Sequence, residues 1–208
     1  MLIIFDVDGT LIDSIDDIKL SADTALLKYG FHGKPKDFYM NLMGESFESF
    51  FKKVLPENIE QKDLNAVMSE FKEIHGKSVP YTGISEVVSE MKKRGHIIAV
   101  LSNKLQNAAE EYANRFFEGK FSLIAGNSDK YGPKPNPDGI YYIMDKLDFT
   151  NKKDVVYIGD TATDALTAKN ADVGFAAALW GYGNKKEMEN CSAILHADSP
   201  SDLLKIIN

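Results

Sequence analysis

Short apolar runs alternate with segments of helical periodicity along most of this chain. The runs have the composition of buried parallel strands, and each ends in a polar or glycine-containing turn. They are Leu2–Phe5, Ile97–Leu101, Phe121–Ala125, Val155–Ile158, Val173–Ala178 and Ala193–Leu195. Helices are predicted between them at Ile84–Arg94, Leu105–Phe117 and Pro137–Leu147, and Gly95 is expected to end the first helix. This alternation predicts an α/β fold with a Rossmann-like, doubly wound, mainly parallel sheet.

Residues 16–79 interrupt the alternation. Their apolar residues recur at helical spacing in separate stretches, and no convincing strand lies among them. The stretches are Ile18–Tyr29, Phe47–Leu55 and Leu64–Phe71. We therefore predict a helical insertion at residues 16–79, carried by an α/β core domain made of residues 1–15 and 80–208.

The charge balance narrows the range of partners. The 208 residues carry a formal net charge of -7, and the pI is about 5.1. Such a surface repels polyanions, so nucleic acid is not expected as a partner. The single cysteine, Cys191, excludes an internal disulfide and is typical of a reducing compartment. Because no apolar run reaches the length of a signal-peptide core or a membrane span, we expect a cytoplasmic protein without membrane contact.

Polar side chains follow the predicted strands. Ligand-binding residues of open α/β sheets gather at the carboxyl ends of the strands, so these side chains are expected at one edge of the sheet. In chain order they are Asp6, Asp8, Ser102, Lys134, Asp160 and Asp164. The set combines carboxylates with one hydroxyl and one ammonium group.

This set of side chains suits phosphoryl transfer. A carboxylate can attack phosphorus and form an aspartyl-phosphate, which divides one difficult step into two easier ones. Magnesium prefers oxygen ligands, so several of the carboxylates could hold Mg²⁺. Donors such as Ser102 and Lys134 can stabilise the charge on the transferring group.

The four motifs together resemble those of the haloacid dehalogenase superfamily. They are the DVDGT run at Asp6–Thr10, Ser102 after a strand, the KPNP run at Lys134–Pro137 and the GDTATD run at Gly159–Asp164. Further stretches are similar to the phosphoglycolate phosphatase branch: Phe5–Ser14, Tyr81–Gly83, Leu101–Lys104 and Gly181–Gly183. The resemblance covers essentially the whole chain. It implies that the helical insertion is a cap domain that closes over the site.

The resemblance assigns a metal site and an acid/base pair. Asp6 matches the nucleophile, which is also a magnesium ligand. Asp8 matches the general acid/base, and its backbone carbonyl is expected on the metal. Asp160 matches the direct acidic ligand. Asp164 would support the metal through a water or by orienting Lys134.

The resemblance also assigns residues that bind phosphate and substrate. Ser102 and Lys134 match the phosphate-binding pair, assisted by the backbone amide of Asn103. Gly9 and Thr10 are expected beside the phosphate. In the cap, Glu45 and Ser46 lie in a stretch that resembles the loop facing the active site in related phosphatases.

The expected function is that of a magnesium-dependent phosphatase acting on a small phosphate monoester, in the manner of a phosphoglycolate phosphatase. The presence of Asp8 disfavours a dehalogenase, because a halide needs no proton to leave. A β-phosphoglucomutase-like sugar phosphomutase and a pyrophosphatase remain alternatives, although no dedicated cap-linker acid/base is identified between Asp13 and Lys28. A phosphate-binding regulatory module without catalysis would be expected to lack Asp6 or Asp8, and both are present. The substrate and the oligomeric state stay open.

A purely structural interpretation exists for some of these residues. Asp160 could be the N-cap of the helix that follows Gly159, and Asp164 a first-turn acid favoured by the helix dipole. These structural roles are compatible with metal binding.

Overall fold

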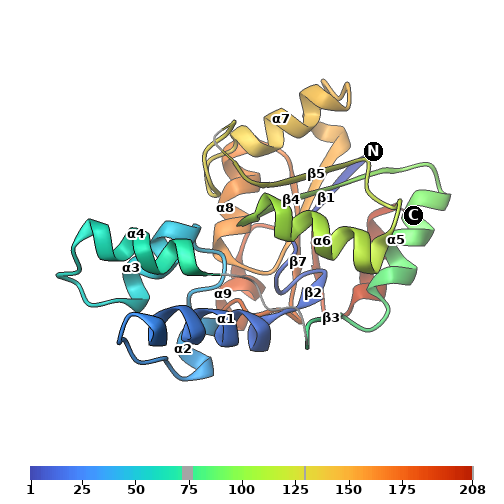
Figure 1. Ribbon diagram of the computed structural model, residues 1–208. Helices are drawn as coiled ribbons and strands as arrows, with labels where there is room; N and C mark the ends of the chain where they lie inside the picture. The colour runs from blue at the N-terminus through green and yellow to red at the C-terminus, as the bar shows by residue number, and fades with distance from the viewer. Residues whose placement is uncertain (72–76, 129, 208) are drawn as a thin grey trace.

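A six-stranded sheet forms the centre of the molecule (Figure 1). The computed structural model describes residues 1–71, 77–128 and 130–207, so residues 72–76 of the predicted insertion lie outside the described residues. All of the strand pairs in this sheet are parallel, in the order β5-β4-β1-β6-β7-β8. The strands are β1 (Leu2–Phe5), β4 (Ile97–Leu105), β5 (Leu123–Asn127), β6 (Val155–Gly159), β7 (Gly174–Ala178) and β8 (Leu195–Ala197). The predicted doubly wound α/β core is confirmed.

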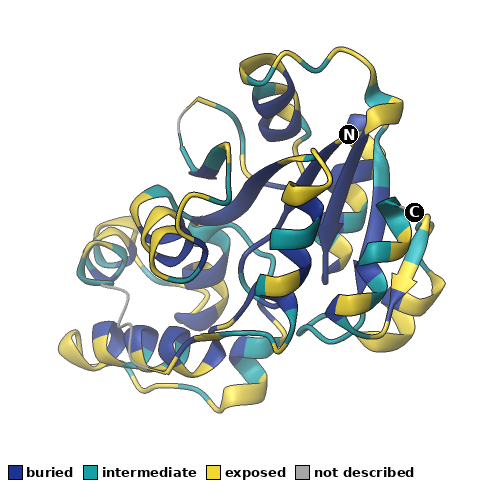
Figure 2. Cartoon of the chain, turned by 90° about the vertical axis from the view of Figure 1, so that its right-hand side faces the viewer, coloured by how far each residue is buried: buried dark blue, intermediate teal, exposed yellow. Residues whose placement is uncertain are grey.

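Helices cover both faces of the sheet. Alternate side chains of each strand point to opposite faces, and in the central strands both sets are apolar, so both faces are buried under helices. Ile3 and Phe5 of β1 pack with one helical layer, and Leu2 and Ile4 pack with the other. The first layer consists of α5 (Ile84–Lys93), α6 (Gln106–Phe117) and the 3-10 helix η2 (Pro200–Ile207). The second consists of α7 (Asp138–Lys146), α8 (Ala162–Ala171) and α9 (Lys185–Asn190), and the short 3-10 helix η1 (Lys152–Asp154) precedes β6. Figure 2 shows the central strands buried and the outer sides of the helices exposed.

Gly95 ends α5 as predicted. Its φ of 85° lies in the left-handed region, which glycine adopts without a side-chain penalty. The Gly95 amide donates to the Lys92 carbonyl, and the His96 amide donates to the Met91 carbonyl. This pair of bonds is the Schellman arrangement that satisfies the last carbonyls of a helix.

The helical insertion has an apolar core of its own. It contains α1 (Ile15–Lys28), α2 (Lys36–Met40), α3 (Phe47–Val54) and α4 (Gln61–Glu70), which lie beside the sheet in Figure 1. Tyr39 and Phe50 stack with ring centroids 5.8 Å apart, and Phe51 is fully buried between the helices. The sequence pattern predicted α1, α3 and α4, whereas the short α2 was not predicted.

The two connections between core and insertion pair with each other. β2 (Ile12–Asp13) and β3 (Val79–Pro80) form a small antiparallel sheet, which the sequence pattern did not predict. In α1, buried Asp17 accepts hydrogen bonds from the backbone amides of Lys77 and Ser78. The chain therefore leaves and re-enters the core side by side.

Several predicted strand limits are shifted in the structure. β4 continues past Leu101 to Leu105, with an irregular register against β5. β5 and β8 lie further along the chain than predicted, because polar residues such as Asn127 of β5 and His196 of β8 take part in pairing. Among the described residues, no helix combines the length and hydropathy that a bilayer crossing requires.

Candidate active site

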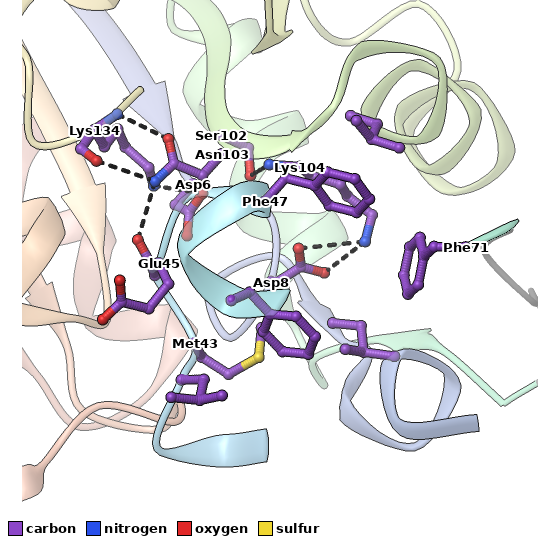
Figure 3. Close-up of a pocket in the computed structure, with 15 residues that line it drawn as sticks. Asp6, Asp8, Met43, Glu45, Phe47, Phe71, Ser102, Asn103, Lys104 and Lys134 are labelled. Carbon is purple, nitrogen blue, oxygen red and sulfur yellow. Dashed lines mark hydrogen bonds and ion pairs between the residues drawn. The ribbon is translucent and has the colours of Figure 1, made fainter. Parts of the chain in front are cut away.

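The carboxyl ends of neighbouring strands bring the predicted side chains together around one pocket (Figure 3). Asp6 follows β1, Ser102 lies in the last part of β4, and Lys134 lies in the loop after β5. Asp160 follows β6 directly. The pocket lies between this edge of the core and the helical insertion, and Asp6, Asp8, Ser102, Asn103 and Lys134 all line it.

Lys134 is the centre of a buried polar network. Its Nζ lies 2.8 Å from Asp6 Oδ1 and 2.6 Å from Asp164 Oδ1. It also donates to the Tyr157 hydroxyl at 2.8 Å. Burial opposes the charge on Lys134, but Asp164 and Asp6 outweigh it, so the pKa of Lys134 is raised. The ammonium group is therefore held charged, with a fixed direction, at the floor of the pocket.

Asp160 is held from two sides. Thr10 Oγ1 donates to its Oδ1 at 2.8 Å, and the Tyr182 amide donates to its Oδ2 at 2.8 Å. Gly9 passes so close that a Cβ at this position would lie 2.2 Å from Asp160 Oδ2, and its φ is 85°. Gly9 and Thr10 are not among the residues that line the pocket, and the structure places both next to Asp160.

Three buried carboxylates converge beside the ammonium group of Lys134. Oxygen atoms of Asp6, Asp160 and Asp164 lie within 4.8 Å of one another. Burial raises the pKa of Asp6 to about 6, with Lys134 opposing the shift and Asp164 reinforcing it. Burial and the charges of Asp164 and Asp6 raise the pKa of Asp160 well above its ordinary value.

A divalent cation fits this cluster. Asp6 Oδ1 is a buried oxygen without an aligned hydrogen bond among the described residues, since its 2.8 Å approach to Lys134 is an ion pair only. A cation beside Asp6 and Asp160 would take up such an oxygen and remove the repulsion between the carboxylates. The donors are all oxygen, which is the set that magnesium prefers.

Asp164 is occupied by protein donors. Its Oδ1 accepts from Lys134 and Tyr157, and its Oδ2 accepts from the Thr161 amide and hydroxyl. Thr161 and Asp164 form the capping box of α8, so the interpretation of Asp160 as the helix N-cap is wrong. Burial opposes the charge on Asp164, but Lys134 and Thr161 outweigh it and lower its pKa.

Asp8 lies on the other side of the pocket from Lys134. Lys104 Nζ is 3.1 Å from Asp8 Oδ1 and 3.3 Å from Asp8 Oδ2, and the Ser14 hydroxyl also donates to Oδ1. Lys104 Nζ lies 4.8 Å from the centroid of the Tyr112 ring. The Asp8 side chain retains 12% exposure, compared with 5% for the side chain of Asp6, and Asp8 lines the pocket.

Asn103 connects three parts of the site. Its Oδ1 accepts from the Lys134 amide at 2.8 Å, which fixes the loop that carries the lysine. Its Nδ2 donates to the carbonyl of Lys134 and to that of Gly44 in the insertion. The Asn103 side chain thus contacts both walls of the pocket, a role that the sequence did not indicate.

The insertion contributes a largely apolar wall. Its lining residues are Ile18, Leu42, Met43, Gly44, Glu45, Phe47, Phe50 and Phe71. Glu45 accepts from Ser49 Oγ at 2.6 Å and pairs with Lys53. Ser46 is not among the lining residues, because its hydroxyl caps α3 by accepting from the Ser49 amide.

Sequence reasoning missed several residues that hold the site together. Lys104 was named within the stretch Leu101–Lys104, but its contact with Asp8 was not predicted. Tyr157 lies within an apolar strand, where a buried hydroxyl needs partners, and it finds them in Lys134, Asp164 and the Leu101 carbonyl. Tyr182, between two glycines, gave no signal that it would contact Asp160.

Comparisons with known proteins agree with this architecture. The chain is 28% identical over 211 residues to the phosphoglycolate phosphatase of Aquifex aeolicus (strain VF5), covering 100% of this chain and 96% of that protein. It is 26% identical to phosphoglycolate phosphatase 1 of Pseudomonas aeruginosa, covering 98% and 78%. The crystal structure of a predicted phosphoglycolate phosphatase from Haemophilus somnus 129pt has the same fold, with a TM-score of 0.89, 23% identity and coverage of 100% of this chain and 97% of that chain.

The family assignment follows from the span of the sequence match. The family model for haloacid dehalogenase-like hydrolases matches residues 3–178, which include every motif residue of the pocket. This chain belongs to the haloacid dehalogenase-like hydrolase family.

Proposed function

We propose that this hydrolase is a magnesium-dependent phosphatase that cleaves a small phosphate monoester through an aspartyl-phosphate on Asp6. The observation that carries the proposal is the pocket itself. Asp6, Asp8, Ser102 and Lys134 line it together, and Asp6 also belongs to the acidic cluster with Asp160 and Asp164. The names of the relatives from Aquifex aeolicus and Pseudomonas aeruginosa support a substrate similar to phosphoglycolate.

In the first half-reaction, a carboxylate oxygen of Asp6 attacks the phosphorus atom. A bond forms between this oxygen and phosphorus, and the bond from phosphorus to the ester oxygen breaks. Protonated Asp8 donates its proton to the departing ester oxygen, so the leaving group departs as an alcohol and not as an alkoxide. The placement of Asp8 on the pocket side opposite to Lys134 is consistent with a position next to the leaving group.

In the second half-reaction, Asp8 acts as the base. It takes a proton from a water molecule, whose oxygen attacks phosphorus. The bond between phosphorus and Asp6 breaks, which yields inorganic phosphate and restores the Asp6 carboxylate. Asp8 is again protonated at the end, so the cycle closes without any other co-reactant than water.

Ser102 and Lys134 would hold the phosphoryl group. Ser102 is a buried hydroxyl at the pocket, and Lys134 carries a charge stabilised by Asp164. Donors that are already oriented stabilise charge in the transition state without reorganising. We infer that Asp164 acts mainly by orienting Lys134, since protein donors already occupy both of its oxygens.

Asp6, Asp160 and the backbone carbonyl of Asp8 would hold Mg²⁺, with Asp164 close by. When bound, the ion neutralises charge on the phosphoryl oxygens and on the carboxylates around it. The paired connections at β2 and β3 suit an insertion that moves as one cap over the pocket. Cap closure would exclude water while the aspartyl-phosphate forms.

The test uses p-nitrophenyl phosphate, a chromogenic phosphate ester. Purified protein should release nitrophenol with magnesium, lose this activity in EDTA and regain it when magnesium is restored. Asp6→Asn keeps the shape of the side chain and removes the attacking charge, so turnover should fall to background. Near-normal turnover by Asp6→Asn, or full activity in metal-free buffer, would contradict the mechanism.

The same assay separates the alternatives. A panel of 2-phosphoglycolate, pyrophosphate, sugar phosphates and nucleotides should release inorganic phosphate fastest from a small monoester. Retention of phosphate on a sugar product would indicate a phosphomutase, and fastest cleavage of pyrophosphate would indicate a pyrophosphatase. A protein that binds phosphate but turns over none of the panel would be a binding module.

A further inference from the structure

The carboxamide of Asn103 binds both backbone polar groups of Lys134. Its Oδ1 accepts from the Lys134 amide at 2.8 Å, and its Nδ2 donates to the Lys134 carbonyl at 3.2 Å (Figure 3). Both residues are buried. Pro133 and Pro135 carry no amide hydrogen, so the Lys134 amide is the only backbone donor of that tripeptide. Asn103 therefore fixes the backbone from which the ammonium group of Lys134 extends.

The same carboxamide also contacts the insertion. Its Nδ2 donates to the carbonyl of Gly44 at 3.0 Å, in the segment between α2 and α3. A carboxamide nitrogen carries two hydrogens, so one can serve the Lys134 carbonyl and the other the Gly44 carbonyl. These partners also decide which end of the carboxamide is the oxygen, because the Lys134 amide needs an acceptor and the two carbonyls need donors. Asn103 thus joins one residue of the core to one residue of the insertion.

Gly44 lies too close to the core to carry a side chain. Its φ of 88° is in the left-handed region, and a Cβ at this position would lie 2.8 Å from Thr161 Oγ1. Thr161 in turn donates to Asp164, which accepts from Lys134 Nζ. The Gly44 segment is therefore seated against two residues of the Lys134 network, Asn103 and Thr161. This contact uses the backbone of the insertion and is independent of the side chains that line the pocket.

We propose that Asn103 is a positioning residue that couples the seating of the Gly44 segment on the core to the placement of Lys134. The inference rests on the proposed function, in which Lys134 holds the phosphoryl group. With Gly44 seated, three hydrogen bonds fix the carboxamide of Asn103. When the Gly44 carbonyl moves away, Asn103 loses one of these bonds, and its hold on the Lys134 backbone weakens. Lys134 is therefore best placed for phosphate when the insertion is seated.

The experiment is a double-mutant cycle on the affinity for inorganic phosphate, measured by titration calorimetry with magnesium present. Phosphate has no leaving group, so this affinity reports the phosphate site and not the acid/base step. Asn103→Ala should weaken phosphate binding by roughly 10- to 100-fold, because the hydrogen bonds that orient a charged group are lost. Gly44→Ala should weaken it by roughly 10-fold, because a Cβ would meet Thr161 and shift the Gly44 carbonyl away from Asn103.

The coupling is the difference between two measurements of the same change. In the Asn103→Ala background, Gly44→Ala should cost at least about threefold less affinity than in the wild-type protein, since the shared carboxamide is already absent. Gly30→Ala is the matched control, because Gly30 in the insertion has a φ of 78° but a Cβ there would meet nothing within 4 Å. It imposes a similar backbone strain and should leave the phosphate affinity at the wild-type value.

A second variant covers a failure of Asn103→Ala to fold. Asn103→Asp has the same shape and keeps the acceptor for the Lys134 amide, and it loses the donor to Gly44. The effect of its added charge is present in both backgrounds and cancels in the cycle. Gly44→Ala should again cost at least about threefold less in this background.

Three results would overturn the proposal. The losses of the two single variants could multiply in the double variant, and Gly44 would then act independently of Asn103. Asn103→Ala could bind phosphate as tightly as the wild-type protein, and the carboxamide would then not place Lys134. The wild-type protein could bind no phosphate at all. A wild-type protein that binds phosphate but does not hydrolyse p-nitrophenyl phosphate would instead overturn the proposed function, and the cycle would still decide the role of Asn103.

Discussion

The two walls of the pocket are built by opposite means. The core wall is made of buried charges that hold one another: Lys134 binds Asp6, Asp164 and Tyr157 within 2.8 Å. The wall of the insertion is made of aromatic and aliphatic side chains, and its carboxylate, Glu45, is paired within the insertion by Lys53.

This difference separates two tasks. Catalytic groups need fixed directions, and a network of mutual hydrogen bonds on strand ends provides them. Substrate selection needs a surface whose shape can vary, and apolar side chains on helices can change without disturbing buried charges. We therefore expect substitutions in the core to change the rate of the chemistry and substitutions in the insertion to change which ester is preferred.

After the loss of turnover expected for Asp6→Asn, the largest effect is expected at Asp8. Asp8→Ala should slow turnover of an alkyl phosphate by ~100- to 10,000-fold, because general acid/base catalysis typically contributes that much. The loss should shrink for p-nitrophenyl phosphate, whose leaving group is already acidic. Steady-state rates for both esters provide the measurement, with Asp16→Ala, an exposed acid on α1, as the control. An equal loss for both esters would show that Asp8 does not protonate the leaving oxygen.

Phe51 tests whether the insertion is an independent unit. This ring is fully buried in the core of the insertion, so Phe51→Ala should cost about 3–5 kcal/mol of stability there. Limited proteolysis should then cut within residues 15–71 while the sheet stays protected. Phe117→Ala, at a ring of α6 buried against the sheet, is the matched change in the core and should expose the core instead. The same cleavage pattern in both variants would contradict the division into two units.

The smallest effects are expected at Glu45 and Ser46. Glu45→Ala should shift the relative kcat/KM values of a phosphate ester panel by roughly up to fivefold, because a partly exposed ion pair contributes about 0–1 kcal/mol. Ser46→Ala should change the panel less, since Ser46 caps α3 and does not line the pocket. If Glu45→Ala lowered all rates in proportion, the insertion would share in the chemistry and the comparison would fail.

The sequence predicted the core well for a simple physical reason. A strand buried on both faces must be almost wholly apolar, so runs such as Leu2–Phe5 are distinct in the sequence. The polar residues that follow such strands then lie at one edge by topology alone. The resemblance to the haloacid dehalogenase superfamily is confirmed by the family match over residues 3–178.

The sequence could not predict contacts that depend on the exact path of loops. Thr10 was expected beside the phosphate, but its hydroxyl bonds to Asp160 from a position distant in sequence. Ser46 was expected in the loop that faces the substrate, and the sequence did not predict that its hydroxyl would cap α3. Lys104 was singled out only within the stretch Leu101–Lys104, and its contact with Asp8, which follows another strand, was not predicted. Contacts of this kind can be predicted only when the positions of the strands and of the insertion relative to one another are known.

Tyr182 has a consequence for the energetics of the whole molecule. Its amide holds Asp160, and its hydroxyl accepts hydrogen bonds from the amides of Ser14 and Ile15 in the connection to the insertion. Tyr182 therefore contacts both Asp160, a candidate metal ligand, and the segment Ser14–Ile15 where the insertion begins. If a rotation of the insertion changes the hydrogen bond from Tyr182 to Asp160, it changes the affinity of Asp160 for a cation. By thermodynamic reciprocity, binding of a cation at Asp160 must then favour one orientation of the insertion by the same free energy. We therefore expect a change in the orientation of the insertion to change the affinity for the ion, and binding of the ion to change that orientation.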